Sequence, residues 1–380
     1  MPTGRLTGAA ARAQPSDALR QSSALQSFAV LVARVVAKLE PGGAQLSILR
    51  VTRAFAGRGH QTRLLAGHAT EAGVEMAREH GVEPELMDAE EDLQWRCDPA
   101  FAAWLAPRLV GADVVHAHMF GAWWAAGHAV APGVPFAASE HNDLVWPGEP
   151  SWAAVAEVAD RVDRFYAHSP GARLRVVQAG LSEERVVSGV SPVEGIGATE
   201  LPGLPSPRIV FTGRLALDKG PDVLVEAVSR MVDPPPVLLL GAGVLESALR
   251  ASVAEAGLED VVRLCGWVAD PAPWVAGASV QVCPSRDEAF SQAAVLAMCL
   301  GVPVLGTRVD GFPETLADGR GLMVDPDDPT AMADALEELL SGSRTTDLAG
   351  ARKWAEGFVI EKVASMYERD YVELCRAVAV

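Results

Sequence analysis

Two positively charged residues, Arg214 and Lys219, stand five positions apart in a chain that carries a net charge of −17. They follow a strand predicted at Arg208–Thr212. Arginine can bind two oxygens of one phosphate group, and lysine adds a point charge. The pair therefore predicts a site for a departing diphosphate. The alternative is a surface ion pair without function.

Two carboxylates, Asp287 and Glu288, lie between a predicted buried strand, Val280–Cys283, and a helix predicted from about Phe290 to Leu300. A second strand, Val302–Gly306, follows. Strand, helix and strand with short loops form a parallel unit, whose ligands bind beyond the carboxyl ends of the strands. The exposed N–H groups of a helix start favour a phosphate or a sugar hydroxyl. Glu288 is alternatively a carboxylate that complements the helix dipole.

Four polar residues, Glu140, His141, Asn142 and Asp143, come directly after an apolar strand predicted at Pro135–Ser139. Polar groups at the end of a buried strand are costly unless they face a site or find partners. We therefore expect them to contact a ligand. A simple turn also uses Asn and Asp, but does not usually follow Glu-His.

A predicted strand at 113–118 ends in His116 and His118, and an aromatic cluster that includes Trp123 follows it. Because successive strand residues face opposite ways, we expect one histidine to be structural. Trp123 is either packed in the core or part of an apolar wall for a sugar or cyclitol ring.

Two glycine turns follow apolar strands. Gly42 and Gly43 lie after the strand predicted at Phe28–Val36, and Gly241 and Gly243 follow a later one. Such turns let the backbone approach a ligand closely, although tight turns alone explain them. A nicotinamide dehydrogenase needs GxGxxG with an acid about twenty residues later, which Gly42-Gly43 does not supply.

The chain length, the net charge and the cysteine content limit the class of protein to which this chain can belong. A chain of 380 residues predicts two domains. The negative net charge argues against binding of nucleic acid and against broad adhesion to an anionic membrane. No apolar run is long enough to predict an integral membrane segment. The five scattered cysteines fit a reduced, cytoplasmic compartment. Residues 1–26 lack the apolar core of a signal peptide, so we expect a mobile tail.

The central stretch carries a recognisable pattern: Pro284-Ser285-x-x-Glu288-x-Phe290, Ala297-Met298 and Gly301-x-Pro303-Val304. It resembles the family-four retaining glycosyltransferases, which have the GT-B fold. That family usually has a second glutamate eight residues after the first, where this chain has Leu296. Ala289 and Ser291 replace two glycines.

The resemblance implies an α/β protein with two Rossmann-like domains that face each other across a cleft. It implies an acceptor domain over 27–195, a linker over 196–207, a donor domain over 208–360, and a helix over 361–380 that returns to the first domain.

The resemblance also implies site residues. It implies catalytic roles for His141, Arg214, Lys219 and Glu288. The residues expected at the donor are Gly42, Gly43, Gly213, Arg214, Lys219, Gly241, Gly243, Trp267, Val268, Glu288, Phe290, Ser291 and Gln292. Those expected at the acceptor are His118, Trp123, Glu140, Asn142 and Asp143.

The family works without a cofactor and usually without a metal. The sequence Asp325-Pro326-Asp327-Asp328 formally matches the DxD motif of metal-dependent transferases. It follows a strand and precedes a helix, so we predict an N-cap turn there and no metal site.

The implied reaction moves a sugar from a nucleoside diphosphate, expected to be UDP, to a hydroxyl of a small polar acceptor, with retention of configuration. Segments 116–124 and 139–143 resemble the transferases of aminoglycoside biosynthesis, and Glu140, Asp143 and Glu149 suit a cationic acceptor. Because Ser291 narrows the sugar pocket, we expect an amino or otherwise modified sugar. Three alternatives remain open: a transferase of cell-envelope lipid or polysaccharide, a nucleotide-sugar-binding protein without activity, and a nucleotide-sugar epimerase.

Overall fold

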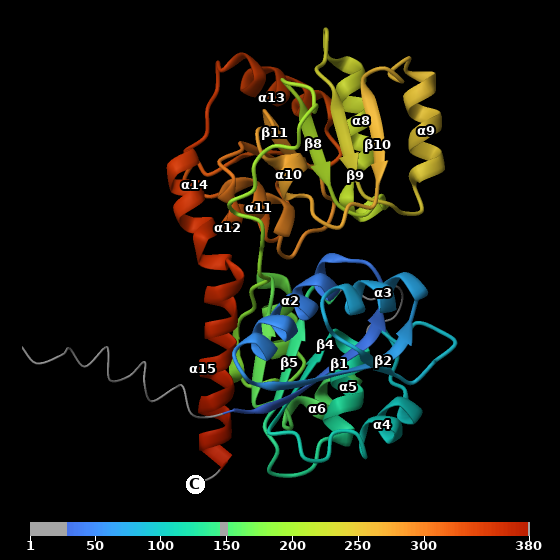
Figure 1. The fold of residues 1–380 in the computed structure, drawn as a ribbon, viewed down its shortest axis with the longest axis vertical. Helices are drawn as coiled ribbons and strands as arrows, with labels where there is room; N and C mark the ends of the chain where they lie inside the picture. Colours follow the sequence, from blue (N-terminus) through green and yellow to red (C-terminus); the bar gives the residue numbers. More distant parts are fainter. Residues whose placement is uncertain (1–28, 145–150, 379–380) are drawn as a thin grey trace, which may run out of the picture.

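The computed structural model describes residues 29–144 and 151–378. Two parallel α/β domains lie one above the other, and a long C-terminal helix runs along the first (Figure 1). The expected tail at 1–26 and Glu149 lie outside the described residues.

The first domain is built on a seven-stranded parallel sheet with the order β3-β2-β1-β4-β5-β6-β7. Its strands are β1 (Leu31–Leu39), β2 (Gln61–Ala69), β3 (Pro84–Leu86), β4 (Val114–His118), β5 (Phe136–Glu140), β6 (Arg164–Ala167) and β7 (Val186–Ser188). Its helices are α2 (Gly43–Gly57), α3 (Glu71–Glu79), α4 (Pro99–Leu105), α5 (Phe120–Ala129), α6 (Trp152–Ala159) and α7 (Pro170–Gln178).

The second domain is built on a six-stranded parallel sheet with the order β10-β9-β8-β11-β12-β13. Its strands are β8 (Ile209–Thr212), β9 (Val237–Leu240), β10 (Val262–Gly266), β11 (Val280–Cys283), β12 (Val304–Thr307) and β13 (Leu322–Val324). Its helices are α8 (Pro221–Arg230), α9 (Glu246–Glu255), α10 (Ala272–Val275), α11 (Gln292–Cys299), α12 (Phe312–Thr315), α13 (Pro329–Ser341) and α14 (Leu348–Ala355).

Helix α15 (Ile360–Val378) returns to the first domain, as expected, and packs on α2 and β4. Its apolar face, which includes Val363, Tyr367 and Tyr371, is buried against the first sheet. An amphipathic helix buries one such stripe against a core. The last helix therefore ties the chain end back to the first domain (Figure 1).

The expected N-cap turn at the start of α13 is confirmed. The Asp328 side chain accepts a hydrogen bond from the backbone N–H of Ala331 at 2.9 Å. Asp327 pairs with Arg286, and Asp325 pairs with Arg308. These three carboxylates therefore have structural partners.

Candidate functional site

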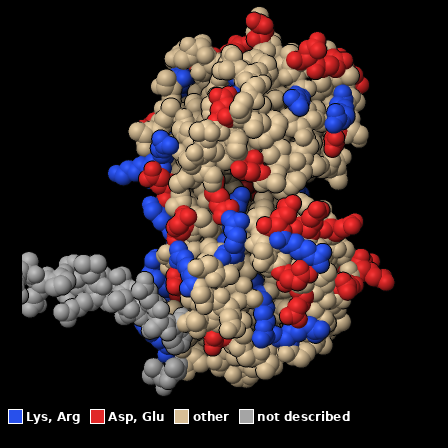
Figure 2. Space-filling view, in the orientation of Figure 1, with Lys and Arg blue, Asp and Glu red and all other residues tan. Residues whose placement is uncertain are grey.

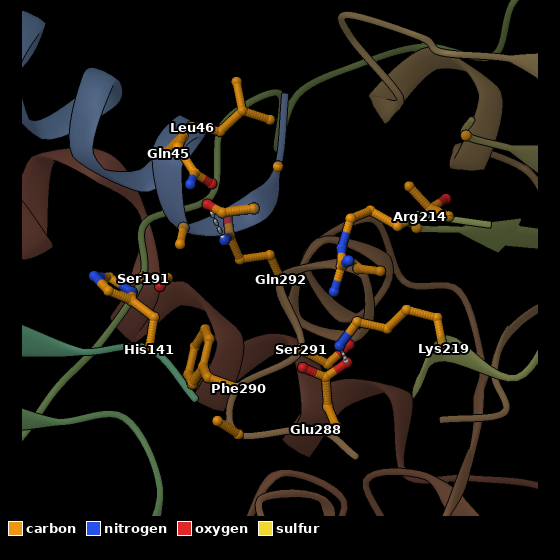
Figure 3. Close-up of a pocket in the computed structure, with 18 of the residues that line it drawn as sticks. Gln45, Leu46, His141, Ser191, Arg214, Lys219, Glu288, Phe290, Ser291 and Gln292 are labelled. Atoms are coloured by element: carbon orange, nitrogen blue, oxygen red, sulfur yellow. Dashed lines mark hydrogen bonds and ion pairs between the residues drawn. The ribbon is translucent and has the colours of Figure 1, made fainter. Parts of the chain in front are cut away.

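A cavity of about 560 Å³ lies between the two domains. Loops at the carboxyl ends of strands from both sheets form its walls, which is where parallel sheets bind their ligands. Figure 3 shows Lys219 and Glu288 on one side of the cavity, His141 and Ser191 on the other, and Phe290 between them.

Lys219 holds a fixed positive charge at the cavity wall. Its Nζ donates to Glu288 Oε2 at 3.1 Å and to the backbone oxygen of Asp287 at 3.3 Å. Burial lowers the pKa of Lys219, but the carboxylates of Glu288 and Asp218 outweigh this, so the pKa is raised. Lys219 is therefore charged at neutral pH, and Glu288 is oriented by it.

Arg214 supplies a second, more accessible cation. Its Nη2 donates to Asp218 Oδ2 at 2.8 Å, and half of its side chain is exposed. Lys219 Nζ also lies 3.8 Å from the same Asp218 oxygen. The exposed half of the Arg214 side chain can therefore reach an anionic ligand in the cavity.

Two glycines hold the backbone of this wall in place. A Cβ on Gly241 would lie 1.8 Å from the backbone oxygen of Gly213, and a Cβ on Gly311 would lie 2.0 Å from that of Ala289. The N–H of Gly311 also donates to the backbone oxygen of Glu288 at 3.0 Å. The close approach of the Gly311 loop thus fixes the position of the Glu288 backbone.

The apolar residues that line the cavity include Leu240, Trp267, Val268 and Leu296. Trp267 is 44% exposed, so part of its indole is accessible to a ligand. The structure therefore brings Trp267 and Val268 into the cavity wall, as expected. Gly243 is not in the wall, because it packs against Leu215.

Gln292 connects the two domains beside the cavity. Its Nε2 donates to the backbone oxygen of Gly43 at 2.7 Å, and its Oε1 accepts from Arg50 Nη1 at 3.2 Å (Figure 3). The preceding residue, Ser291, caps α11 by accepting from the N–H of Ala294 at 3.3 Å. Gln292 therefore joins the start of α11 to the start of α2.

His141 lines the cavity and is held from behind by other histidines. Its Nε2 lies 3.2 Å from His118 Nδ1, and its ring centroid lies 4.0 Å from that of His168. Burial lowers the pKa of His141 to about 4, so its ring is neutral at pH 7. His141 can therefore exchange hydrogen bonds with a ligand without carrying charge.

We expected one of His116 and His118 to be structural because successive strand residues face opposite ways, but the structure buries both. They are two positions apart on β4, and residues two apart share a face of a strand. Both rings are buried on the same side, with centroids 4.1 Å apart. His118 does not line the cavity and reaches it through His141.

Of the five residues expected at the acceptor, the structure brings only Asn142 into the cavity wall. Trp123 is core: it is 1% exposed and stands at right angles to Phe120 and Phe165. Its Nε1 donates to Glu140 Oε2 at 3.1 Å.

Glu140 is buried and orients the turn that follows it. It accepts from the Asn142 side chain at 2.9 Å and from the N–H of His141 at 3.1 Å. Burial raises the pKa of Glu140 to about 8. Asp143 is also buried; Ser169 Oγ donates to it, and Arg175 lies 3.6 Å from it. Both residues therefore position the loop and do not line the cavity.

Several cavity residues were not predicted from the sequence: Lys38, Glu40, Arg50, Asp92, Trp95 and Glu194. Lys38 Nζ lies 2.8 Å from Glu40 and 2.9 Å from Asp92. Arg50 Nε lies 3.3 Å from Glu194. The sequence did contain one indication of these residues: Lys38 and Glu40 interrupt the apolar run at the end of β1.

No group of three or more His, Cys, Asp and Glu side chains in 29–144 and 151–378 is arranged to hold a metal ion. Within the same ranges, no helix has the length and apolar character needed to cross a membrane.

Comparison with known proteins adds the family. Residues 206–342 match the family described as glycosyl transferases group 1, and residues 41–188 match glycosyltransferase family 4. A D-inositol 3-phosphate glycosyltransferase from Streptomyces scabiei is 32% identical over 304 residues, which is 67% of this chain and 67% of that protein. The one from Streptomyces avermitilis is 33% identical over 233 residues, covering 56% and 49%. The chain thus spans about half to two-thirds of the length of these relatives.

Solved structures share the fold at low identity. Anabaena Alr3699/HepE in complex with UDP has a TM-score of 0.72 at 17% identity, over 90% of this chain and 99% of that one. Sucrose-phosphate synthase from Thermosynechococcus elongatus has a TM-score of 0.69 at 18% identity, over 92% and 100%. The expected GT-B architecture is confirmed.

Proposed function

Because this chain belongs to the family 4 (group 1) glycosyltransferases, we propose that it transfers a sugar from a nucleoside diphosphate to a hydroxyl of a small polar acceptor. The observation that carries the proposal is the charge arrangement across one cavity. Lys219, paired with Glu288, and Arg214 stand on the wall of the second domain, and the neutral His141 comes from the first.

The cation pair suits the leaving group. As the bond between the anomeric carbon and the diphosphate breaks, negative charge grows on the phosphate oxygens. Groups that are already oriented stabilise such charge without reorganisation. Lys219 and Arg214 are held by Asp218 and Glu288, so the proposed reaction needs no metal ion.

The proposed mechanism retains the anomeric configuration. The acceptor hydroxyl attacks the anomeric carbon on the face that the nucleotide leaves, and a departing phosphate oxygen takes the hydroxyl proton. Glu288 binds hydroxyls of the donor sugar, and His141 orients the sugar or the acceptor. No enzyme nucleophile forms a covalent bond in this scheme.

We propose UDP as the nucleotide of the donor, and an amino or otherwise modified sugar as the group that is transferred. The partly exposed indole of Trp267 lines the cavity and offers a surface on which a base can stack. UDP is also named in the structure of Anabaena Alr3699/HepE. Leu296 is only 6% exposed in the wall and offers no hydrogen bond to a ribose.

For the acceptor we propose a neutral or cationic cyclitol, such as an aminocyclitol of an aminoglycoside. On the side of the first domain, Lys38 is shared by two carboxylates, Glu40 and Asp92, and Arg50 pairs with Glu194. These carboxylates suit an ammonium group. The relatives are named for an inositol phosphate, whose phosphate would need a free cation here. A cytoplasmic location remains a prediction.

The visible face of the molecule carries charges of both signs. Figure 2 shows acidic and basic side chains mixed on the visible face, around the boundary of the two domains. The small cavity is therefore the better guide to the substrate.

Calorimetric titration with nucleoside diphosphates, in the presence of a chelator, tests the donor. Lys219→Met removes a charge-assisted contact and should weaken UDP binding about tenfold or more. Lys353→Met, on an exposed residue of α14, is the matched control and should change nothing. If no nucleoside diphosphate binds the native chain, the proposal is wrong.

A transfer assay then compares acceptors. We expect product with an aminocyclitol, and less with inositol 3-phosphate, when UDP-sugars are offered to the full chain. The anomeric configuration of the product, read by NMR coupling constants, decides retention. Faster transfer to the phosphorylated cyclitol would overturn the proposed acceptor class and leave the donor assignment intact.

A further inference from the structure

Four histidines form a row that runs from the core of the first domain to the cavity wall. Ring centroids are 4.1 Å apart from His116 to His118, 5.5 Å from His118 to His141, and 4.0 Å from His141 to His168. His141 and His168 line the cavity. The mechanism above uses only His141, so the others need an explanation.

The hydrogen bonds at one end of the row fix the protons of His116. Arg34 Nη1 donates to the Tyr371 hydroxyl at 3.3 Å, and a guanidinium can only donate. The single hydroxyl proton of Tyr371 is then free to donate to His116 Nδ1, with which the hydroxyl is hydrogen bonded. In this arrangement His116 carries its proton on Nε2, which lies 2.7 Å from Ser139 Oγ.

His118 and His141, the next pair in the row, are both neutral at pH 7. Burial lowers the pKa of His118 well below its usual value, and the nearby His116, His141 and Arg34 lower it further. Burial lowers the pKa of His141 to about 4. One neutral ring therefore donates a single proton to the other across the 3.2 Å between His118 Nδ1 and His141 Nε2.

The far nitrogen of His118 decides the direction of this bond. His118 Nε2 is buried and has no hydrogen-bond partner within the described residues. If His141 were the donor, His118 would carry its proton on Nε2, as an orphaned buried N–H. Such N–H groups are rarer in proteins than unsatisfied acceptors. The lower-cost arrangement puts the proton on His118 Nδ1, which then donates to His141.

The open nitrogen of His141 faces a ligand. His141 Nδ1 makes no hydrogen bond within the described residues, and it is not among their buried unpartnered atoms. The residue is partly exposed and lines the cavity. Its Nδ1 is therefore the ring nitrogen that a ligand can reach.

We propose that His118 is a positioning residue that fixes His141 as the Nδ1–H tautomer, so that His141 presents a hydrogen-bond donor to the substrate. The ligand atom opposite is then an acceptor oxygen, such as that of a sugar or cyclitol hydroxyl. An ammonium group, which can only donate, is excluded at this position. Only the identity of that oxygen rests on the proposed function.

The tautomer can be read directly in the native chain. Histidine labelled with ¹⁵N in the full-length protein gives ring-nitrogen shifts that distinguish a protonated from a bare nitrogen, and the spectrum of His141→Gln assigns the signals of His141. We expect a protonated Nδ1 and a bare Nε2 at pH 7. A protonated Nε2 in the native protein overturns the proposal.

Two substitutions separate positioning from packing. His118→Phe keeps a ring against His116 but removes the donor, and His118→Asn removes the ring but keeps an amide donor near the place of Nδ1. We expect kcat/KM to fall about tenfold in the first, with substantial rescue in the second. An active His118→Phe beside an inactive His118→Asn overturns the proposal in favour of packing.

The two readouts distinguish failure of this inference from failure of the proposed function. The spectrum of the native protein decides the tautomer even where a variant does not fold. A native protein without transferase activity, but with His141 protonated on Nδ1, refutes the proposed function and supports the assignment of the tautomer.

Discussion

A carboxyl group of the second domain faces a carboxylate of the first. Asp310, in the loop after β12, interacts with Asp143, which follows β5. Its Oδ2 is buried and has no hydrogen-bond partner within 29–144 and 151–378. Burial, together with the Asp143 carboxylate, raises the pKa of Asp310 from 3.8 to about 7. Asp287 raises it further, and a hydrogen bond from Ser169 lowers it.

This shift makes stability depend on pH in a defined direction. Below about pH 4, Asp310 is protonated in both the folded and the unfolded chain and contributes nothing. Above that, the unfolded chain ionises first, so the free energy of unfolding falls until about pH 7 and is then level. At 1.36 kcal/mol per pH unit the full effect is about 4 kcal/mol, and solvent screening of this partly exposed group reduces it to about 2 kcal/mol.

Asp310→Asn removes the ionisation and keeps a donor for Asp143. Roughly half of the penalty builds up above pH 5, so the substitution should stabilise the chain by about 1 kcal/mol more at pH 8 than at pH 5. In a domain of this size that is a difference of about 2 to 4 °C in the shift of Tm. Thermal unfolding at the two pH values measures it, and Asp334→Asn, on an exposed residue of α13, is the control.

An equal shift of Tm at pH 5 and pH 8, or a larger gain at pH 5, would refute this reasoning. The first result would mean that Asp310 ionises normally in the folded chain, so the carboxyl groups do not meet. The second would mean that the folded chain favours the ionised form. The control variant should show no pH-dependent difference from the native chain.

Three further changes have expected outcomes. Trp267→Ala should weaken UDP binding about tenfold in calorimetry, because the exposed indole face is lost. Gly241→Ala should lower the free energy of unfolding by about 3 kcal/mol or more, since its Cβ would lie 1.8 Å from the oxygen of Gly213; denaturant unfolding checks this. Gln292→Ala removes a 2.7 Å contact with Gly43 across the domains and should raise the donor KM several-fold in steady-state kinetics.

Buried strands were the easiest elements to predict. The strand predicted at Val280–Cys283 has those bounds, because a strand buried on both faces is a continuous apolar run between turns. The first strand was misplaced: it was expected at 28–36 and spans Leu31–Leu39. Lys38 interrupts the apolar run, and its charge is met by Glu40 and Asp92, which the sequence pattern does not reveal.

The site was predicted best where short sequence motifs contain its residues. Arg214, Lys219 and Glu288 lie on two loops of neighbouring strands, so local patterns were enough to bring them together. The pairing of Gln292 with Gly43 was out of reach, because it joins residues 249 positions apart on different domains. The contact of Lys38 with Asp92 also depends on the path of a long loop.

The polar residues after β5 show why the acceptor side was predicted poorly. A strand end can present only a few side chains to a cavity, and the remaining polar groups must find partners within the protein. Here His141 and Asn142 reach the cavity, while Glu140 turns inward and accepts hydrogen bonds from Trp123 and Asn142. The cost of burying Glu140 is thus offset by bonds that also fix the residues in front of it. The sequence pattern identified a polar cluster of the right kind, but the cluster has two layers, and only the layer in front lines the cavity.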